Sequence, residues 1–174
     1  MFGYHMEDDP ALVSHRLSRE ETVLAVPEPM AAECLSPEEI RGFKEEGIVS
    51  LRPFSGCPFV RMDADTWMGE QFDRYCREDG FDPKIFVISQ SVLTVLECCA
   101  EGIGATLVPA GYLDHLTAEQ RRGMVFFRWR YPDVTLLGAV LHLKSSYITK
   151  AAMDFVKCSQ KICGEEESLW NGFF

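Results

Sequence analysis

The sequence has 174 residues, of which 47% are hydrophobic and 25% are charged. This length and composition are typical of a globular protein with one domain or two small lobes. The formal net charge of -10 argues against nucleic-acid binding by this chain alone, because phosphate contacts need a basic surface.

Membrane and secretory signals are missing from the sequence. No apolar run is long enough to span a membrane, and the first residues lack the basic start and apolar stretch of a secretory signal. The seven cysteines contain no CxxC pair. We therefore expect free thiols and a cytoplasmic location.

The first part of the chain carries clear turn and cap signals. Residues 1–4 predict a short edge strand, and the polar residues 5–18 predict a loop. Residues 21–26 predict a strand, and residues 27–29 (PEP) predict a stiff extended connector after it. A serine, a proline and a glutamate then open a predicted helix over residues 36–46, which a glycine terminates.

A strand is predicted next at residues 57–62, and residues 63–65 (DAD) predict the cap of the following helix. Gly80 is expected to end this helix. Its apolar positions recur with helical spacing. The residues expected to face the core are Met68, Phe72, Tyr75 and Cys76.

Residues 81–109 predict a strand, a helix and a second strand. Residues 84–88 form the first strand, residues 104–108 form the second, and Pro109 ends it. Such a unit implies a parallel pair with a right-handed crossover. The helix between them is expected to begin after a cap at 89–91 (SQS) and to end at Gly102. Its expected core face is Val92, Val95, Leu96 and Cys99.

The last third continues the alternation of helix and strand. Thr117 is expected to cap a helix within residues 110–123, and strands are predicted at 125–129 and 135–143. The remaining expectations are a turn at 131–133, a last helix capped by Thr149, inward residues Ala152, Phe155, Val156, Ser159 and Ile162, and a tail at 165–174 that is disordered or packed against a neighbour. The alternating elements predict an α/β fold.

No catalytic motif stands out in the sequence. The four histidines lack metal-ligand spacing, the glycines do not form a dinucleotide fingerprint, and no nucleophile elbow is present. Cys98 and Cys99 are adjacent, but no neighbouring base would lower the pKa of either thiol. We therefore expect no enzyme activity, no cofactor and no metal. A reactive thiol in this pair remains the enzymatic alternative.

Four segments in this order resemble the C-terminal effector-binding region of LysR-type transcriptional regulators. They are ETVLAVPEP (21–29), LRPFSGCPFVRM (51–62), FDPKIFVISQSVLTVLECCAEGIGATLVP (81–109) and LLGAVLHLKSSYITKAAMDFVK (136–157). The most specific parts are EGIGATLVP and YITKAAMDF.

The resemblance implies a fold similar to type 2 periplasmic binding proteins, with two α/β lobes joined by two crossing strands and a small ligand in the cleft. Residues 21–26 and 135–143 would be the crossing strands. Residues 28–140 would form a complete lobe II, while 1–27 and 141–174 would form part of lobe I. Residues 35–46 are extra relative to the usual family pattern.

The resemblance also implies the effector-binding residues. The loop Arg61-Met62-Asp63, the turn Ser89-Gln90-Ser91 and Pro109 match cleft positions. Ser89 and Gln90 can donate hydrogen bonds to a carboxylate beside the free amides of a helix. Simpler roles stay open, because the serines and Asp63 can act only as helix caps, Arg61 can face solvent, and Pro109 can merely shape the cleft wall.

The family's winged helix-turn-helix, linker helix and first part of lobe I have no counterpart in this sequence. We therefore expect a sensor of a small, anionic effector that forms a homodimer or higher homo-oligomer and contacts DNA only through an absent domain. The alternative is a stand-alone truncated protein that pairs with itself or with full-length regulators through unpaired strand edges.

Overall fold

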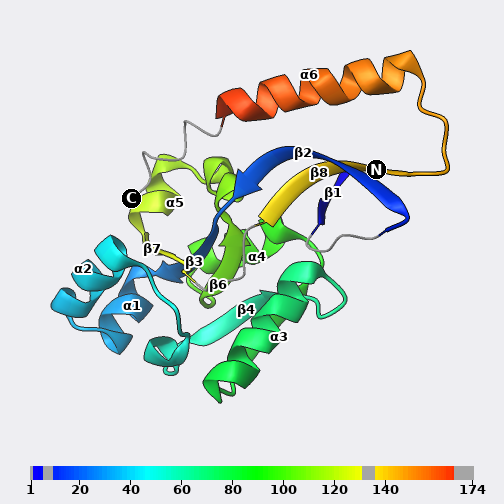
Figure 1. The fold of residues 1–174 in the computed structure, drawn as a ribbon. Coiled ribbons are helices and arrows are strands. Elements are labelled where there is room, and N and C mark those ends of the chain that lie inside the picture. Colours follow the sequence, from blue (N-terminus) through cyan, green and yellow to red (C-terminus); the bar gives the residue numbers. More distant parts are fainter. Residues whose placement is uncertain (1, 6–9, 131–135, 167–174) are drawn as a thin grey trace. The chain divides into compact units, whose positions relative to one another are not determined.

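The structure is a computed structural model, and it describes residues 2–5, 10–130 and 136–166 (Figure 1). These residues form two compact units. Unit 1 combines the residues up to Glu21 with the strand and helix after residue 135, and unit 2 begins at Thr22. Helices and strands are mixed along the chain. The division expected from the sequence, a complete lobe II over residues 28–140 and a partial lobe I over 1–27 and 141–174, stays a prediction.

Unit 1 contains a three-stranded antiparallel sheet in the order β1-β8-β2. Its elements are β1 (Phe2–His5), β2 (Leu12–Glu20), β8 (Leu136–Leu143) and the helix α6 (Lys150–Glu166). The first strand lies at the sheet edge, as predicted. The loop predicted over residues 5–18 is wrong from Leu12 onward. The strand β2 forms there by pairing with β8, which is distant in the sequence, so the local residues give no strand signal.

The helix α6 begins at the predicted cap and packs on β2. The hydroxyl of Thr149 accepts a hydrogen bond from the backbone N–H of Ala152 at 3.2 Å. The side chain of Gln160 donates to the carbonyl of Arg16 at 2.9 Å. Val156 is buried, so this residue anchors the helix as expected.

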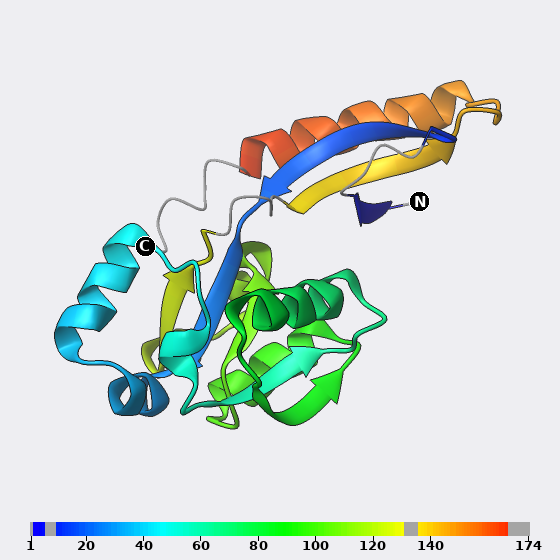
Figure 2. The ribbon, with the colours of Figure 1, turned by 60° about the horizontal axis from the view of Figure 1, so that its bottom comes forward.

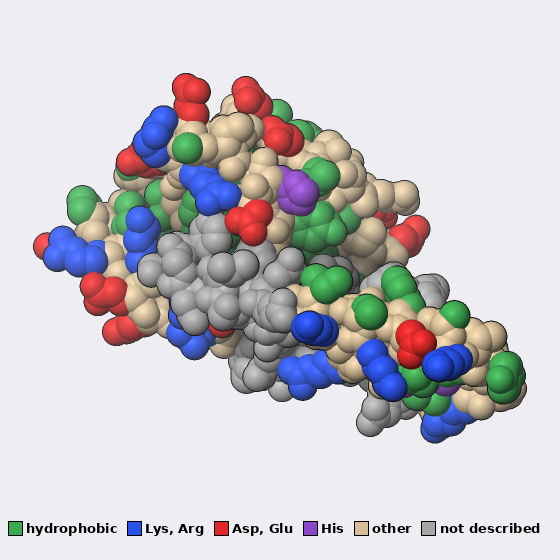
Figure 3. Space-filling model, turned by 90° about the horizontal axis from the view of Figure 1, so that it is seen from above, with side chains coloured by type: hydrophobic (Ala, Val, Ile, Leu, Met, Phe, Trp, Pro, Cys, Tyr) green, Lys and Arg blue, Asp and Glu red, His purple; other side chains and the backbone are tan. Residues whose placement is uncertain are grey.

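Three of the residues expected to point inward from α6 are exposed instead. Ala152 is exposed, and Phe155 and Ile162 are 51% and 60% exposed. Figure 3 shows hydrophobic side chains interspersed with lysines and arginines over this part of the surface. The prediction failed because a helix that packs on a single small sheet buries a narrower face than the spacing of its apolar residues suggests.

Unit 2 is built on strands that pair in two groups. The strand β3 (Thr22–Pro27) lies between β6 (Thr106–Pro109) and β7 (Met124–Arg128) and is antiparallel to both. The strand β4 (Pro58–Met62) runs parallel to β5 (Lys84–Ser89). These strands agree with those expected from the sequence to within one or two residues.

A parallel bridge between Phe59 and Ala105 connects the two groups of strands. The N–H of Ala105 donates to the carbonyl of Pro58 at 2.8 Å. Gly104 permits this approach, because a Cβ at that position would lie 2.7 Å from the same carbonyl. The strands β5 and β6 therefore do not pair directly, as the sequence had suggested, since β4 lies between them. The carboxyl ends of β4, β5 and β6 consequently lie at the same edge.

The helices of unit 2 are α1 (Glu28–Cys34), α2 (Pro37–Glu46), η1 (Arg52–Phe54), α3 (Trp67–Asp79), α4 (Val92–Ala100), η2 (Ala110–His115) and α5 (Ala118–Arg122). Three of them, namely α2, α4 and α5, begin at the serine or threonine caps that were expected. The predicted extended connector at residues 27–29 is wrong, because α1 starts there with a proline in its first turn, where the missing N–H costs no hydrogen bond.

Local capping explains several of these boundaries. Ser36 and Glu39 form a reciprocal capping box at the start of α2, and Thr117 forms one at the start of α5. Gly80 ends α3 with a φ of 60°, and Gly102 follows α4 with a φ of 77°. Both glycines have the positive φ that favours glycine, at the helix ends where the sequence predicted them.

The core of unit 2 surrounds β3 and β4. Residues 23–26 of β3 have no exposed surface. The ring of Phe59 on β4 lies 5.5 Å from that of Phe72 on α3, and these elements lie side by side in Figures 1 and 2. Val60, the next residue of β4, is also fully buried, and α4 contacts this strand. The predicted core residues of α3 are all buried.

The helix α4 also buries most of the face expected for it, namely Val95, Leu96 and Cys99. The predicted turn at 131–133 and most of the predicted tail, residues 167–174, lie outside the described residues.

Candidate functional site

The two loops expected to bind a ligand lie side by side at the carboxyl edge of β4 and β5. Met62 is in register with Ser89, and the N–H of Asp63 donates to the carbonyl of Ser89 at 2.9 Å. Because the two strands are parallel, both chains leave the sheet at this point. The loop 61–63 and the turn 89–91 are thus held together by backbone pairing.

The turn 89–91 forms the beginning of α4. The hydroxyl of Ser91 accepts a hydrogen bond from the N–H of Thr94 at 3.3 Å, so Ser91 caps the helix as predicted. The hydroxyl of Ser89 accepts from the N–H of Ser91 at 3.1 Å. Gln90 is exposed. Each serine hydroxyl still has its own hydrogen to donate, so capping and ligand binding are compatible in this turn.

The first turn of α4 adds further donors to the same place. A helix leaves its first N–H groups without intrahelical acceptors, and these groups carry the positive end of the helix dipole. The N–H of Thr94 is taken by Ser91. The amides of Val92 and Leu93 therefore remain as donors for a carboxylate or phosphate placed over the turn.

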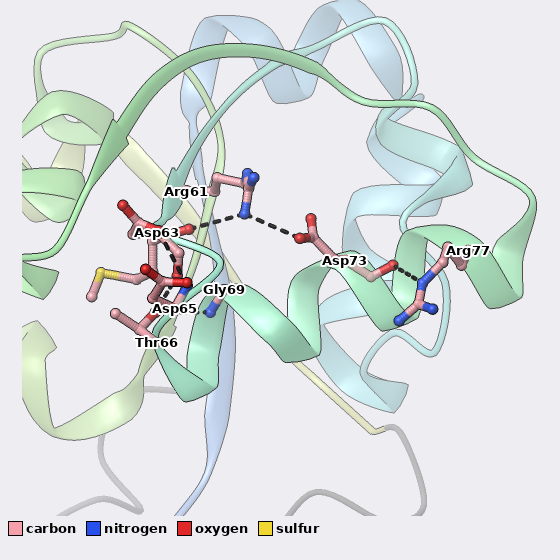
Figure 4. Close-up of polar contacts among 8 residues, drawn as sticks. Arg61, Asp63, Asp65, Thr66, Gly69, Asp73 and Arg77 are labelled. Carbon is pink, nitrogen blue, oxygen red and sulfur yellow. Dashed lines mark hydrogen bonds and ion pairs between the residues drawn. The ribbon is translucent and has the colours of Figure 1, made fainter.

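Arg61 turns toward α3 (Figure 4). Its Nη1 donates to the carbonyl of Met62 at 3.2 Å and to the carboxylate of Asp73 at 3.3 Å. Only 15% of its side chain is exposed. Its Nε is buried and meets no acceptor in the part of the chain that the structure describes.

Asp63 does not cap α3 as expected. Thr66 caps this helix, since its hydroxyl accepts from the N–H of Gly69 at 3.1 Å and donates to the carbonyl of Asp63 at 2.6 Å (Figure 4). The carboxylate of Asp63 instead accepts from the N–H of Asp65 at 3.1 Å. This loop is tight, because a Cβ on Gly69 would collide with the Asp63 carbonyl.

The remaining predicted site residues are parts of the sheet. Met62 is 6% exposed, so its side chain belongs to the core. Pro109 is buried and lies opposite Thr22 in the pairing of β6 with β3. It ends β6 at the same sheet edge as Ser89.

Thr22 is a residue that the sequence reasoning missed. It is 2% exposed, and its hydroxyl has no hydrogen-bond partner among the described residues. Because it lies opposite Pro109, it belongs to the edge where β4 and β5 end. The only local signal was a polar residue at the start of an otherwise apolar strand, TVLAV.

A hollow of about 520 Å³ lies beside α3. Its lining includes Glu70, Asp73, Asp82, Arg77 and Cys76. Burial, followed by the nearby carboxylates of Asp73 and Asp79, raises the pKa of Cys76 to about 12. The carboxylates make the hollow unfavourable for an anion, and the thiol is kept protonated.

The other chemistry considered in the sequence finds little support among the described residues. Burial raises the pKa of the Cys99 thiol, and its Sγ contacts the carbonyl of Ala25 at 3.4 Å. Cys99 is therefore a core residue. Within the described ranges, no three histidine, cysteine or acidic residues cluster as a metal site would require, and none of the described helices could cross a membrane.

Comparison with known proteins adds to this geometry. The family model for the LysR substrate binding domain matches residues 1–163. No curated protein matches the sequence significantly. Several solved structures do, although at identities that bear only on the fold.

The effector binding domain of QuiR in complex with shikimate is 15% identical with a TM-score of 0.66, over 94% of this chain and 71% of that one. HinK from Pseudomonas aeruginosa, a LysR family transcriptional regulator, is 21% identical with a TM-score of 0.65, over 94% of this chain and 52% of that one. The CcmR regulatory domain from Synechocystis PCC6803 in complex with 2-PG is 9% identical with a TM-score of 0.69, over 93% and 72%.

The chain therefore spans about seven tenths of such isolated domains and about half of the full-length regulators that it matches. Domains of this kind have a type 2 periplasmic-binding-protein-like fold, which confirms the predicted fold class. They are ligand-binding parts of transcriptional regulators rather than enzymes. The family match covers almost the whole sequence, and the chain belongs to the LysR substrate-binding domain family.

Proposed function

We propose that this chain is the effector-sensing module of a LysR-type transcriptional regulator and that it binds a small anionic metabolite at the carboxyl edge of unit 2. In this proposal, unit 2 is the complete lobe of the domain and unit 1 is part of the other lobe. The main support is the register of Met62 with Ser89, which holds two polar loops together at the beginning of α4.

The donors at this edge suit a carboxylate or a phosphate. The hydroxyl of Ser89, the side-chain amide of Gln90 and the first amides of α4 can all donate. Hydrogen bonds to an ionised acceptor are about twice as strong as those between neutral groups. Arg61 lies on the neighbouring loop but already pairs with Asp73. Its charge therefore contributes to the local field rather than to a direct contact.

The proposal can be tested by calorimetric titration with shikimate, 2-PG and a panel of small mono- and dicarboxylates. For any ligand that binds, the double variant Ser89→Ala with Gln90→Ala should weaken the affinity at least tenfold. Ser55→Ala, an exposed serine after η1, should leave it unchanged. Unchanged affinity in the double variant would show that the site lies elsewhere, and lack of binding by the whole panel would contradict an anionic effector.

We also propose that the chain forms a homodimer or a higher homo-oligomer. Within the described strands, β1 and β2 are the outer strands of their sheet, and an outer strand offers unpaired backbone groups to another chain. Light scattering on the purified chain should give at least twice the mass of 19.7 kDa. A single monomeric species at working concentration would refute this part of the proposal.

The stand-alone alternative predicts a different polypeptide in the cell. An antibody against this domain should detect a band clearly longer than this chain if the domain is part of a DNA-binding regulator. A band of this size would support a separate protein, and capture of full-length partners would then be the next experiment.

A further inference from the structure

Two cysteines that play no part in the proposed site lie in contact within unit 2. Cys34 is the last residue of α1, and Cys57 directly precedes β4. Their Sγ atoms are 2.8 Å apart, and both thiols are free. A disulfide bond is about 2.0 Å long, so a small movement of the side chains would bring the sulfurs to bonding distance.

The surroundings give the two thiols different roles. Cys57 is 2% exposed, and burial, followed by the hydrogen bond and charge of Cys34, raises its thiol pKa far above the usual value. Cys34 is partly exposed. A Cβ at position 56 would lie 3.4 Å from Cys34 Sγ. Gly56 has no Cβ, so the residue before Cys57 does not cover the sulfur of Cys34. Cys34 is therefore the thiol that an oxidant can reach. Cys57 is the buried thiol that would react with the oxidised Cys34.

A thiol–thiol hydrogen bond in a packed interior is the simplest use of such a contact. A purely packing role would not require a second sulfur from a residue 23 positions away, however. Cys57 Sγ also lies 3.8 Å from the carbonyl of Met30, so its hydrogen has an acceptor besides Cys34.

We propose that Cys34 and Cys57 are a modification site in which peroxide oxidation forms a reversible intramolecular disulfide. The thiolate of Cys34 attacks one oxygen of hydrogen peroxide and the O–O bond breaks. This step gives a sulfenic acid on Cys34 and a hydroxide that takes up a proton to become water. The sulfur of Cys57 then attacks Cys34 Sγ, the S–O bond breaks, and the departing hydroxide takes the Cys57 proton. Overall, two thiols and one peroxide give one disulfide and two waters.

The site does not depend on the proposed effector function. The disulfide would join the end of α1 to the beginning of β4, at the amino end of a strand whose carboxyl end carries the loop 61–63. Thiol–disulfide exchange with a thiol reductant restores the two thiols.

The test uses the full chain, reduced, freed of reductant and then treated with hydrogen peroxide. Peptide mapping without reduction should find a peptide pair linking Cys34 to Cys57, lighter by two hydrogens than the separate peptides and lost on treatment with dithiothreitol. Protection of Cys34 from alkylation should rise at least tenfold. In Cys34→Ser the pair must be missing, and in Cys158→Ser, an exposed cysteine on α6, it must persist.

A second variant tests whether a sulfenic acid forms on Cys34 as the intermediate. In Cys57→Ala, Cys34 should stop at the sulfenic acid and react with dimedone. The proposal is overturned if wild-type Cys34 stays alkylatable, if it proceeds to sulfinic acid without a link, or if it joins a different cysteine. The mapping on the wild-type chain decides the matter even if the buried substitution prevents folding.

Discussion

Ser91 offers a way to separate helix capping from ligand binding in one side chain. Its hydroxyl accepts from the N–H of Thr94, and aspartate can make the same cap because it is as good an N-cap residue as serine. Aspartate also adds a negative charge where the proposal places an anion. Ser91→Asp should therefore keep the fold and lose the ligand, whereas Ser91→Ala should lose part of the fold's stability and keep the donors of the neighbouring amides.

The magnitudes follow from the cap and from Coulomb's law. Loss of a serine N-cap typically costs about 1 kcal/mol of unfolding free energy. Two like charges about 4 Å apart repel by about 1 kcal/mol in water and by about 4 kcal/mol near a protein surface with an effective dielectric of about 20. Ser91 is exposed, so the lower figure is a minimum. Ser91→Asp should thus weaken an anionic ligand at least fivefold, since 1.4 kcal/mol is tenfold.

The assay combines urea unfolding with calorimetric titration of a confirmed ligand. The controls are Ser36→Ala and Ser36→Asp at the cap of α2, where a serine hydroxyl also accepts from the N–H three residues on, away from the site. Ser36→Ala should lose a similar stability, and neither control should alter the affinity. If Ser91→Asp bound the anion as tightly as the wild type while remaining folded, the placement of the ligand at this helix start would be refuted.

Three further changes test the fold. Gly69→Ala should lower the unfolding free energy by about 1–3 kcal/mol, because its Cβ would meet the carbonyl of the preceding loop. The control Gly42→Ala has open space around it and should be neutral or stabilising by up to about 1 kcal/mol. Equal effects of the two substitutions in urea unfolding would contradict the close packing at Gly69. Phe72→Ala should lower the unfolding free energy by about 3–5 kcal/mol. Phe86 is 56% exposed, so Phe86→Ala should change it by about 0.5 kcal/mol or less. A similarly small loss for Phe72→Ala would contradict the tight packing of Phe72 in the core. Hydrogen bonds from the backbone and then the hydroxyl of the N-cap serine lower the pKa of Glu39, so its charge stabilises the fold above the unfolded-state pKa and ceases to do so as pH falls through the lower folded-state value. The difference in melting temperature between wild type and Glu39→Gln should accordingly shrink toward acid pH, and a constant difference would remove the capping box from the explanation.

Local chemistry explains which parts of the fold could be predicted from the sequence. Helix ends such as those at Ser36 and Gly80 depend on residues within one turn, so their signals lie close together in the chain. The strand β2 (Leu12–Glu20) was missed because it is defined by pairing with β8, more than a hundred residues later. The exposure of Phe155 and Ile162 was missed for a related reason. Helical spacing shows which residues share a face of α6, but it does not show how much of that face the sheet covers.

The candidate site shows the same division. The cap at Ser91 was visible in the sequence, whereas the pairing that places Asp63 beside Ser89 is a property of the parallel register. The direction of Arg61 could not be predicted either, because its partner Asp73 lies on the next helix and is reached only once α3 packs on β4. Residue types at a site were thus accessible from sequence, and their mutual geometry was not.

The strand β4 connects the proposed ligand site with the cysteine pair, and its structure predicts how far one affects the other. Asp63 lies six positions after Cys57, about 20 Å along an extended strand. Phe59 and Val60 between them are fully buried and bound on both sides by neighbouring strands. The disulfide closes the loop from Cys34 to Cys57 and should raise the unfolding free energy by about 3 kcal/mol through the entropy of the unfolded chain.

Because that stabilisation arises mainly in the unfolded state, the carboxyl end of β4 should not move. Oxidation should therefore raise the urea midpoint while changing the affinity for a confirmed ligand less than threefold. Parallel unfolding and titration of the reduced and oxidised chain would test this directly, with Cys34→Ser as the control that peroxide should leave unchanged in both measurements. A large change in affinity on oxidation would show that β4 shifts as a unit, and the two sites would then be coupled through the strand.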